Sequence, residues 1–162
     1  MISVEEYNQA VKEYTKNIFR FLYRSLKDED VSNDIIQDCY MKLWQNRKTV
    51  DPQKVKAWLF SVAHNAMVNY VKIASKKIAL ENHLHAQQVF QKHDFDVKAI
   101  VEKALGELPA IQKSIILLRD FEGYEYKEIG EILELSESQV KVYLFRARLK
   151  VKNSVKSLIN VI

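Results

Sequence analysis

The sequence predicts an all-α protein with two small helical domains joined by a linker, the C-terminal one a helix-turn-helix. Only three glycines and two prolines occur in 162 residues, so few residues interrupt helices. Apolar residues recur at the spacing of amphipathic helices, whereas strand-like alternation is scarce. Across residues 77–97 this periodicity weakens and polar residues cluster. We therefore expect a linker there, between domains at 1–76 and 98–162.

Hydrophobic periodicity in the N-terminal domain predicts three helices, over residues 5–26, 34–47 and 55–76. The polar run Lys27–Asp30 separates the first from the second, which a serine or asparagine at 32–33 can cap. Pro52 can open the third helix, because proline suits a first turn. Trp44 and Trp58 are expected to be buried anchors of this domain.

Residues 107–150 have the layout of a helix-turn-helix. A helix from Pro109 to about residue 121 is followed by Gly123, and a second helix starts near Tyr126. Gly130 is small where two helices would cross closely. Ser136 and the glutamine three residues later form a capping box, which predicts a third helix over about 137–157.

The third helix is the candidate DNA reader, because this motif lays one helix in the major groove. At about 100° per residue, one stripe should face the core: Val140, Leu144, Ala147 and Val151. The opposite face and its flanks comprise Ser138, Gln139, Lys141, Val142, Phe145, Arg146, Arg148 and Leu149. Apolar groups there can touch thymine methyls, glutamine and arginine can pair with base edges, and lysine and arginine can hold phosphates.

The charge pattern agrees with this interpretation. From Asp120 to Glu137 there are seven acids and one base, and from Ser138 to Ile162 there are six bases and no acid. The formal net charge is only +4, so positive charge is concentrated on the candidate reading helix. The alternative is a solvated basic helix whose cations favour the C-terminal end of the helix dipole.

Composition indicates where the protein works. No run of eighteen apolar residues occurs and the first residues do not resemble a signal peptide, so neither a membrane span nor export is expected. A single cysteine, Cys39, excludes an internal disulfide framework and fits the reducing cytoplasm. It lies on an apolar helix face and should be a small buried hydrophobic side chain.

No pattern in the sequence supports catalysis. Asp34 and Asp38 are one helical turn apart and could form a catalytic or metal pair, but no third ligand accompanies them. His83, His85 and His93 could suggest zinc, yet no cysteine or carboxylate set completes a site. We therefore expect no enzyme activity, catalytic residue, metal, cofactor or small-molecule substrate.

Both halves of the chain resemble the sigma-70 family of bacterial RNA polymerase initiation factors, and most closely its small extracytoplasmic-function class. The N-terminal half carries the pattern Asp-x-x-Gln-Asp-x-Tyr-x-x-Leu-Trp over 34–44 and Trp-Leu-Phe-x-Val-Ala-x-Asn over 58–65. The C-terminal half carries Leu108-Pro109, Leu117-Leu118-Arg119, Glu122-Gly123, Tyr126, Glu128-Ile129, Ile132-Leu133, Ser136, Val140-Lys141 and Arg146-Ala147-Arg148. The gap between them is too short for the intermediate domain of larger members, which favours the small class.

The resemblance implies a sigma factor that directs core RNA polymerase to promoters by recognising their minus-thirty-five and minus-ten elements. The implied partners are core polymerase (its β′ coiled coil and β flap), promoter DNA and an anti-sigma factor. The implied location is the cytoplasm, or the inner membrane where an anti-sigma factor holds the protein there. The alternative is an autonomous helix-turn-helix repressor whose N-terminal bundle dimerises or senses a ligand.

The resemblance also assigns residues. The polymerase contacts would be Asp34, Gln37, Asp38 and Arg47. The minus-ten element would be bound by Asn65 and Asn69, whose amides can read an extruded base, with Lys56, Lys72, Lys76 and Lys77 on its phosphates. The minus-thirty-five element would be bound by Ser138, Gln139, Lys141, Val142, Phe145, Arg146, Arg148 and Lys150.

The chain departs from the family pattern at two places in the helix-turn-helix. Glu134 occupies a turn position where glycine is common, so we expect either a strained turn costing roughly 1 kcal/mol or a turn that differs slightly. Val142-Tyr143 replaces a frequent Ser-Arg pair, which makes the reading surface less polar.

Overall fold

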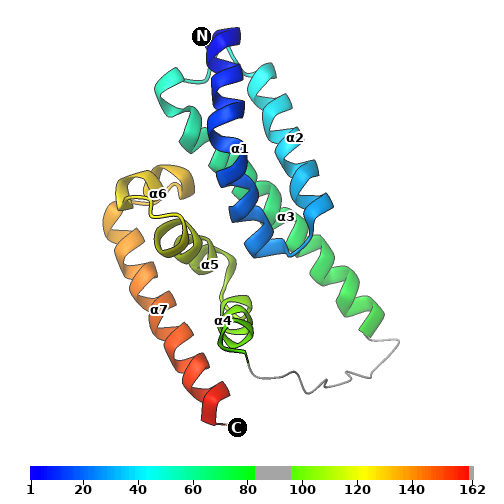
Figure 1. The fold of residues 1–162 in the computed structure, drawn as a ribbon, viewed down its shortest axis with the longest axis vertical. Coiled ribbons are helices and arrows are strands. Elements are labelled where there is room, and N and C mark those ends of the chain that lie inside the picture. Colours follow the sequence, from blue (N-terminus) through cyan, green and yellow to red (C-terminus); the bar gives the residue numbers. More distant parts are fainter. Residues whose placement is uncertain (83–95, 161–162) are drawn as a thin grey trace.

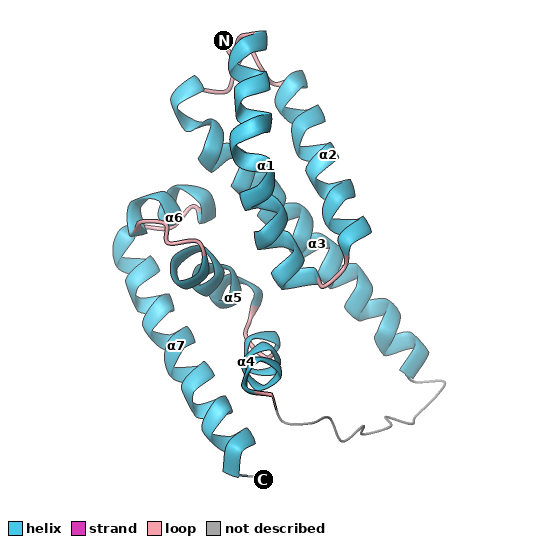
Figure 2. Ribbon diagram, viewed as in Figure 1, coloured by secondary structure: helices cyan, strands magenta, loops and turns pink. Residues whose placement is uncertain are grey.

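The computed structural model describes residues 1–82 and 96–160, and every regular element among them is a helix (Figure 2). This confirms the all-α prediction. The elements in chain order are α1 (Val4–Leu26), α2 (Glu29–Gln45), the 3₁₀ turn η1 (Pro52–Lys54), α3 (Val55–Asn82), α4 (Val97–Gly106), α5 (Ala110–Ile116), the π-helical turn η2 (Leu117–Phe121), α6 (Tyr126–Leu133) and α7 (Glu137–Asn160).

Helices α1, α2 and α3 form the N-terminal bundle (Figure 1). A capping box starts α1, in which the Ser3 hydroxyl accepts from the Glu6 amide and the Glu6 carboxylate accepts from the Ser3 amide. The apolar stripes of the three helices meet in a core that includes Phe21, Leu43 and Phe60. The rings of Phe21 and Phe60 lie 5.9 Å apart, so aromatic contact joins α1 to α3.

Helix α2 begins five residues earlier than the sequence pattern predicted. Its N-cap is Asp28, whose carboxylate accepts from the Val31 amide at 3.0 Å. Lys27 ends α1 in a left-handed conformation, with φ of 55°. The polar run 27–30 separates the two helices as expected, but only by the C-cap of α1 and the N-cap of α2, and its last two residues are already helical. The expected cap at 32–33 therefore lies inside α2.

Helix α3 continues to Asn82, beyond the expected end at residue 76. Residues 77–82, at the start of the predicted linker, are therefore helical, and residues 83–95 lie outside the described part of the chain. Asp51 caps the preceding turn by accepting from the Gln53 amide, so Pro52 occupies a first turn as predicted. The C-terminal part of α3 extends past the other two helices of the bundle (Figure 1).

The expected helix-turn-helix is formed by α6 and α7, with α7 packed along α4 and α5 (Figure 1). A methyl group on Gly130 would lie 2.5 Å from the Leu135 carbonyl oxygen, so only glycine fits this crossing. Glu134 ends α6 with φ of 58°. This left-handed turn is the strained conformation expected for a glutamate at a glycine position.

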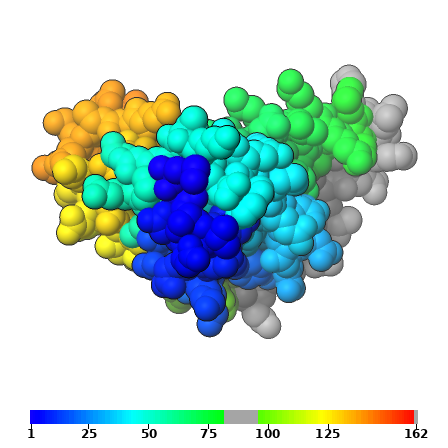
Figure 3. All heavy atoms as spheres, turned by 90° about the horizontal axis from the view of Figure 1, so that it is seen from above, coloured from blue at the N-terminus to red at the C-terminus, as the bar shows by residue number. Residues whose placement is uncertain are grey.

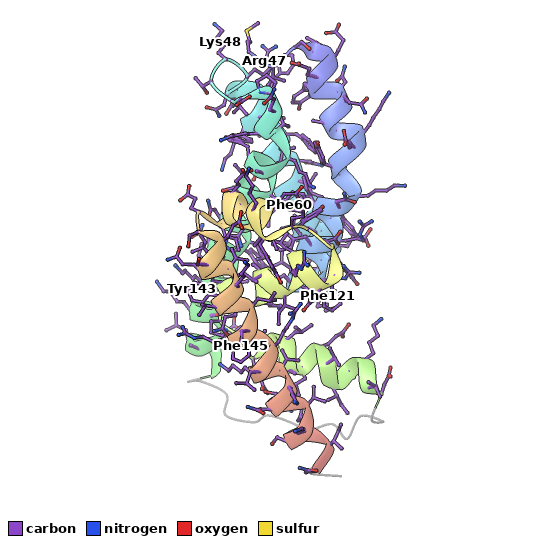
Figure 4. The ribbon with its side chains drawn as sticks, turned by 90° about the vertical axis from the view of Figure 1, so that its left-hand side faces the viewer. Arg47, Lys48, Phe60, Phe121, Tyr143 and Phe145 are labelled. Atoms are coloured by element: carbon purple, nitrogen blue, oxygen red, sulfur yellow. The ribbon has the colours of Figure 1, made fainter. Side chains whose placement is uncertain are left out.

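The two halves share one hydrophobic core. Phe60 of α3 contacts Tyr124, which precedes α6, with ring centroids 5.4 Å apart. Figure 3 shows α6 and the start of α7, in yellow and orange, directly against the N-terminal helices. In Figure 4 Phe60 lies where the two groups of helices meet. The described chain is therefore closed, with its N-terminal and C-terminal helices in contact.

Candidate nucleic-acid interface

The capping box predicted for the candidate reading helix is present at the start of α7. The Ser136 hydroxyl accepts from the Gln139 amide at 3.1 Å, and the Gln139 side-chain oxygen accepts from the Ser136 amide at 2.9 Å. The backbone is thereby fixed at the end of the helix that would enter a groove. In this structure the side chain of Gln139 is a cap as well as a candidate base contact.

The faces of α7 are divided as its periodicity predicted. Val140, Leu144 and Ala147 are buried against the core, and Val151 is half-buried. All the residues expected to contact the minus-thirty-five element are exposed: Ser138, Gln139, Lys141, Val142, Phe145, Arg146, Arg148 and Lys150. Phe145 is 69% exposed. An apolar ring held in water on a basic helix is suited to contact with a thymine methyl or a sugar.

Tyr143 also belongs to this surface, and the motif analysis did not assign it a role. A shallow groove of about 220 Å³ is lined by Ser138, Gln139, Val142, Tyr143 and Arg146. Tyr143 and Phe145 lie on α7 in Figure 4. The phenol of Tyr143 can add a polar contact where the Ser-Arg pair is missing. In the sequence, the position of Tyr143 beside Val142 and between two core positions could have indicated that it lies at the edge of this surface.

Arg148 makes a forked ion pair with Asp120 of η2. Its Nε lies 3.0 Å from Oδ2, and a second nitrogen contacts Oδ1. The hydrogen bond to Asp120 raises the pKa of Arg148. Lys141 is placed differently, with its ammonium group 5.5 Å from the centre of the Tyr126 ring. Of these two cations, Lys141 is the better placed to contact phosphate without breaking an ion pair.

On α3 the structure brings four of the six minus-ten candidates onto one face. Asn65, Asn69, Lys72 and Lys76 are exposed and fall within about 60° of one another at 100° per residue. Two amides followed by two cations thus form a single stripe along the helix. Lys77 lies about 110° from the middle of this stripe but is also exposed.

Lys56 lies on the opposite side of α3, about 180° from Asn65. Its ammonium group is 3.2 Å from the Glu128 carboxylate of α6 and 3.9 Å from the centre of the Tyr124 ring. It is therefore part of the contact between the two halves of the chain and does not belong to the amide stripe.

The candidate polymerase contacts on α2 form an exposed face with Met41 at its centre. Asp34, Gln37 and Asp38 are all exposed, and Met41, one turn further along the same face, is 54% exposed. Sequence reasoning missed Met41, because a methionine at helical spacing usually belongs to the core. An exposed flexible apolar side chain among polar ones is typical of a protein interface.

Arg47 and Trp44 form one unit at the end of α2. The Arg47 guanidinium lies 3.5 Å from the centre of the Trp44 ring, and its Nε donates to the Trp44 carbonyl at 3.1 Å. The expectation that Trp44 is a buried anchor is wrong, because the side chain is 42% exposed. It packs on Tyr7, with ring centroids 5.1 Å apart. Trp58 is half-buried against the core.

The structure also bears on the cysteine, the metal sites and the membrane spans that were considered from the sequence. Cys39 is fully buried, and burial raises the pKa of its thiol to about 12. His83, His85 and His93, considered as zinc ligands, lie outside the described residues. Within residues 1–82 and 96–160, no three His, Cys, Asp or Glu side chains are grouped so as to hold a metal. The helices of this part also include none that is long and apolar enough to cross a membrane.

The chain matches two protein-family models, sigma-70 region 2 over residues 10–76 and sigma-70 region 4 over residues 98–151. It is 31% identical over 145 residues to the ECF RNA polymerase sigma factor SigM of Bacillus subtilis, covering 86% of this chain and 88% of SigM. It is 26% identical over 139 residues to the sigma factor SigV of the same organism, covering 85% and 84% of the two chains.

Two solved structures share its fold. The sigma factor RpoE, in complex with the anti-sigma factor NepR from Bartonella quintana, superposes with a TM-score of 0.72. That match has 22% identity and covers 94% of this chain and 98% of RpoE. CnrH, in complex with the cytosolic domain of CnrY, superposes with a TM-score of 0.71 and 22% identity, covering 93% and 88%.

Proposed function

The chain belongs to the extracytoplasmic-function class of the sigma-70 family, and from that premise we propose which of its surfaces carries each task of the factor. It is an RNA polymerase sigma factor, which directs core polymerase to specific promoters and initiates transcription. The region 2 match over residues 10–76 favours this function over that of an autonomous repressor, which needs no such domain. The factor performs no covalent chemistry itself, acts in the cytoplasm, and is held inactive by an anti-sigma factor.

The outward face of α7 binds the minus-thirty-five element. Phe145, Val142 and Arg146 supply the apolar and cationic groups that reach base edges, while Lys141 and Lys150 hold phosphates. The observation that carries this assignment is the clean division of α7, with its core stripe buried and every candidate contact exposed. Because the apolar side chains of Val142 and Phe145 are exposed on this face, apolar contacts should contribute to the sequence preference beside the polar ones.

The amide stripe of α3 binds the minus-ten element as single-stranded DNA. Asn65 and Asn69 can each donate to and accept from the edge of an unpaired base. Lys72 and Lys76 continue the same face and can track the phosphates of the strand. The α2 face around Met41 docks on the β′ coiled coil, and the C-terminal domain contacts the β flap. Tethering to polymerase makes two individually weak DNA sites effective together.

Run-off transcription with purified core polymerase tests this function, with genomic fragments as templates. We expect specific transcripts that require the chain and fall at least about tenfold with Asn65→Ala or Arg146→Ala, the loss that follows from one contact worth about 1.4 kcal/mol. Matched controls are Asn8→Ala and Lys12→Ala, which remove the same kinds of group from the exposed face of α1.

Two results would contradict these proposals. The absence of any chain-dependent transcript, together with salt-sensitive binding of the chain alone to a palindromic duplex, would restore the repressor alternative. Transcripts that are equally strong with the Asn65 and Arg146 variants would show that the DNA contacts lie elsewhere.

A further inference from the structure

A cavity of about 660 Å³ is lined by residues of α1, α4, α5 and η2 (Figure 1). Its volume lies within the range of about 300–1,000 Å³ that is typical of sites for small molecules. None of the residues that line it is among the proposed contacts with DNA or with polymerase. The function proposed above therefore gives this cavity no role. We call it the α1–α4 cavity.

Part of the wall of the α1–α4 cavity is apolar. Leu105 of α4 and Leu117 of η2 are buried there, and the ring of Phe121, labelled in Figure 4, is exposed beside them. On the α1 side the rings of Phe19 and Tyr23 are stacked, with centroids 5.7 Å apart and an angle of 11° between their planes. These side chains offer a surface for the apolar body of a ligand.

The same cavity is lined by five cations, and only some of them are neutralised. Glu122 lies 3.0 Å from Arg20 and 3.1 Å from Arg24, and Glu102 lies 3.0 Å from Lys27. Among the described residues, these two carboxylates leave an excess of three positive charges around the cavity. The five cations are Arg20, Arg24, Lys27, Lys98 and Lys113.

Lys113 is the cation whose environment points most directly to an anion. Its side chain is half-buried, and its ammonium group donates to the neutral carbonyl of Ser25 at 3.1 Å. Within residues 1–82 and 96–160, it makes no ion pair with a carboxylate. Burial and the nearby charge of Lys27 lower its pKa. An anion placed between these two ammonium groups would offset both unfavourable effects.

We propose that the α1–α4 cavity binds a small amphiphilic anion, a phosphate monoester with an apolar body. Lys113 and Lys27 hold the phosphate, and the apolar body lies against Leu105, Leu117 and Phe121. A phosphate monoester carries nearly two negative charges at pH 7, which matches the excess of positive charge. The site shares no residue with the DNA and polymerase surfaces, so it can be tested independently of them.

Titration calorimetry with octyl phosphate, below the concentration at which it forms micelles, tests the site. The uncharged comparison is octanol, which has the same chain. We expect one molecule of octyl phosphate per chain, bound at least about tenfold more tightly than octanol, because hydrogen bonds to charged groups add to the apolar contact. At about a hundredfold excess over its Kd, octyl phosphate should raise the Tm by roughly 5–10 °C.

Two variants locate the head group. Lys113→Met and Lys27→Gln should each weaken the binding of octyl phosphate about tenfold and leave that of octanol unchanged. The Tm of the free Lys113→Met variant should change little, because burial already opposes the charge that it removes. The matched control is Lys103→Met, which removes an exposed cation of α4 that does not line the cavity and should bind as the natural chain does.

Chain length distinguishes a cavity from adsorption on the surface. Across butyl, hexyl, octyl and decyl phosphate, affinity should rise about fourfold for each added methylene and then level off when the cavity is filled. Three results would overturn the proposal: no measurable binding of octyl phosphate, equal binding of octanol, or an equal loss in the Lys103→Met control. A steady rise with chain length and several molecules bound per chain would overturn it as well.

Discussion

Ser114 and His64 form a buried hydrogen bond across the two halves of the molecule, with Ser114 Oγ 2.9 Å from His64 Nδ1. Ser114 lies on α5 and is fully buried, and His64 lies on α3 beside the candidate base contact Asn65. Burial lowers the pKa of His64. The neighbouring Lys113 has a lowered pKa for the same reason and donates to the Ser25 carbonyl at 3.1 Å. The interface therefore holds two basic groups whose pKa values are lowered by burial in the closed state.

The first prediction concerns pH. His64 has its ordinary pKa of 6.5 when the chain is unfolded and a lower one when folded, so below about 6.5 the unfolded state binds more protons. Stability is therefore fully present above this value and falls as the pH drops through 6.5 towards the lowered pKa. We expect urea unfolding at pH 5.5 to need less denaturant than at pH 7.5. His64→Gln keeps a hydrogen-bonding side chain without the titration, and should reduce this difference; an equal difference in the variant would contradict the prediction.

The second prediction concerns the turn of the helix-turn-helix. Glu134→Gly should stabilise the protein by about 1 kcal/mol, because glycine adopts the left-handed conformation without the steric cost that glutamate bears. Thermal unfolding followed by circular dichroism measures the gain. The comparison is Glu131→Gly, in the interior of α6, where glycine should instead destabilise by a similar amount. A loss of stability at residue 134 would show that the side chain stabilises the turn in some other way.

The third prediction separates two neighbours on the reading helix. Gln139→Ala removes one half of the capping box and should lower the free energy of unfolding by about 0.5–1 kcal/mol. Arg146→Ala lies on the outer face and should change it by less than about 0.5 kcal/mol while weakening binding to the minus-thirty-five element. Denaturant unfolding and DNA binding of both variants distinguish a cap from a reader. Equal losses of stability would contradict this division of roles.

The fourth prediction concerns the α2 face. Met41→Ala should weaken binding to core polymerase by roughly 1–2 kcal/mol, the cost of truncating an apolar side chain at the centre of an interface. Stability should change little, because the side chain is mostly in water. Leu43→Ala should have the opposite pattern of effects. Because Leu43 is buried, this substitution should lower the free energy of unfolding by roughly 2–5 kcal/mol. Competition for core against the natural chain measures the first effect, and undiminished binding would exclude Met41 from the interface.

Much of the fold and of the candidate site could be predicted from the sequence, because helical periodicity acts locally. On α7 the spacing of Val140, Leu144 and Ala147 settles which face is buried, and the outward groups follow from it. The cap formed by Ser136 and Gln139 could likewise be predicted, because it depends on two residues that are close together in the sequence. The amide stripe of α3 follows from the same geometry once the helix is assigned.

Other features were decided only by the tertiary structure. Competition between possible caps placed the start of α2 at Asp28, and packing at the edge of α2 left Trp44 between Tyr7 and Arg47 rather than in the core. The pairing of Lys56 with Glu128 joins residues 72 positions apart, which no local pattern can predict. The sequence by itself thus determined the helices and their outward chemistry, whereas the contact between domains depends on complementary shape and charge that exist only after both domains have folded.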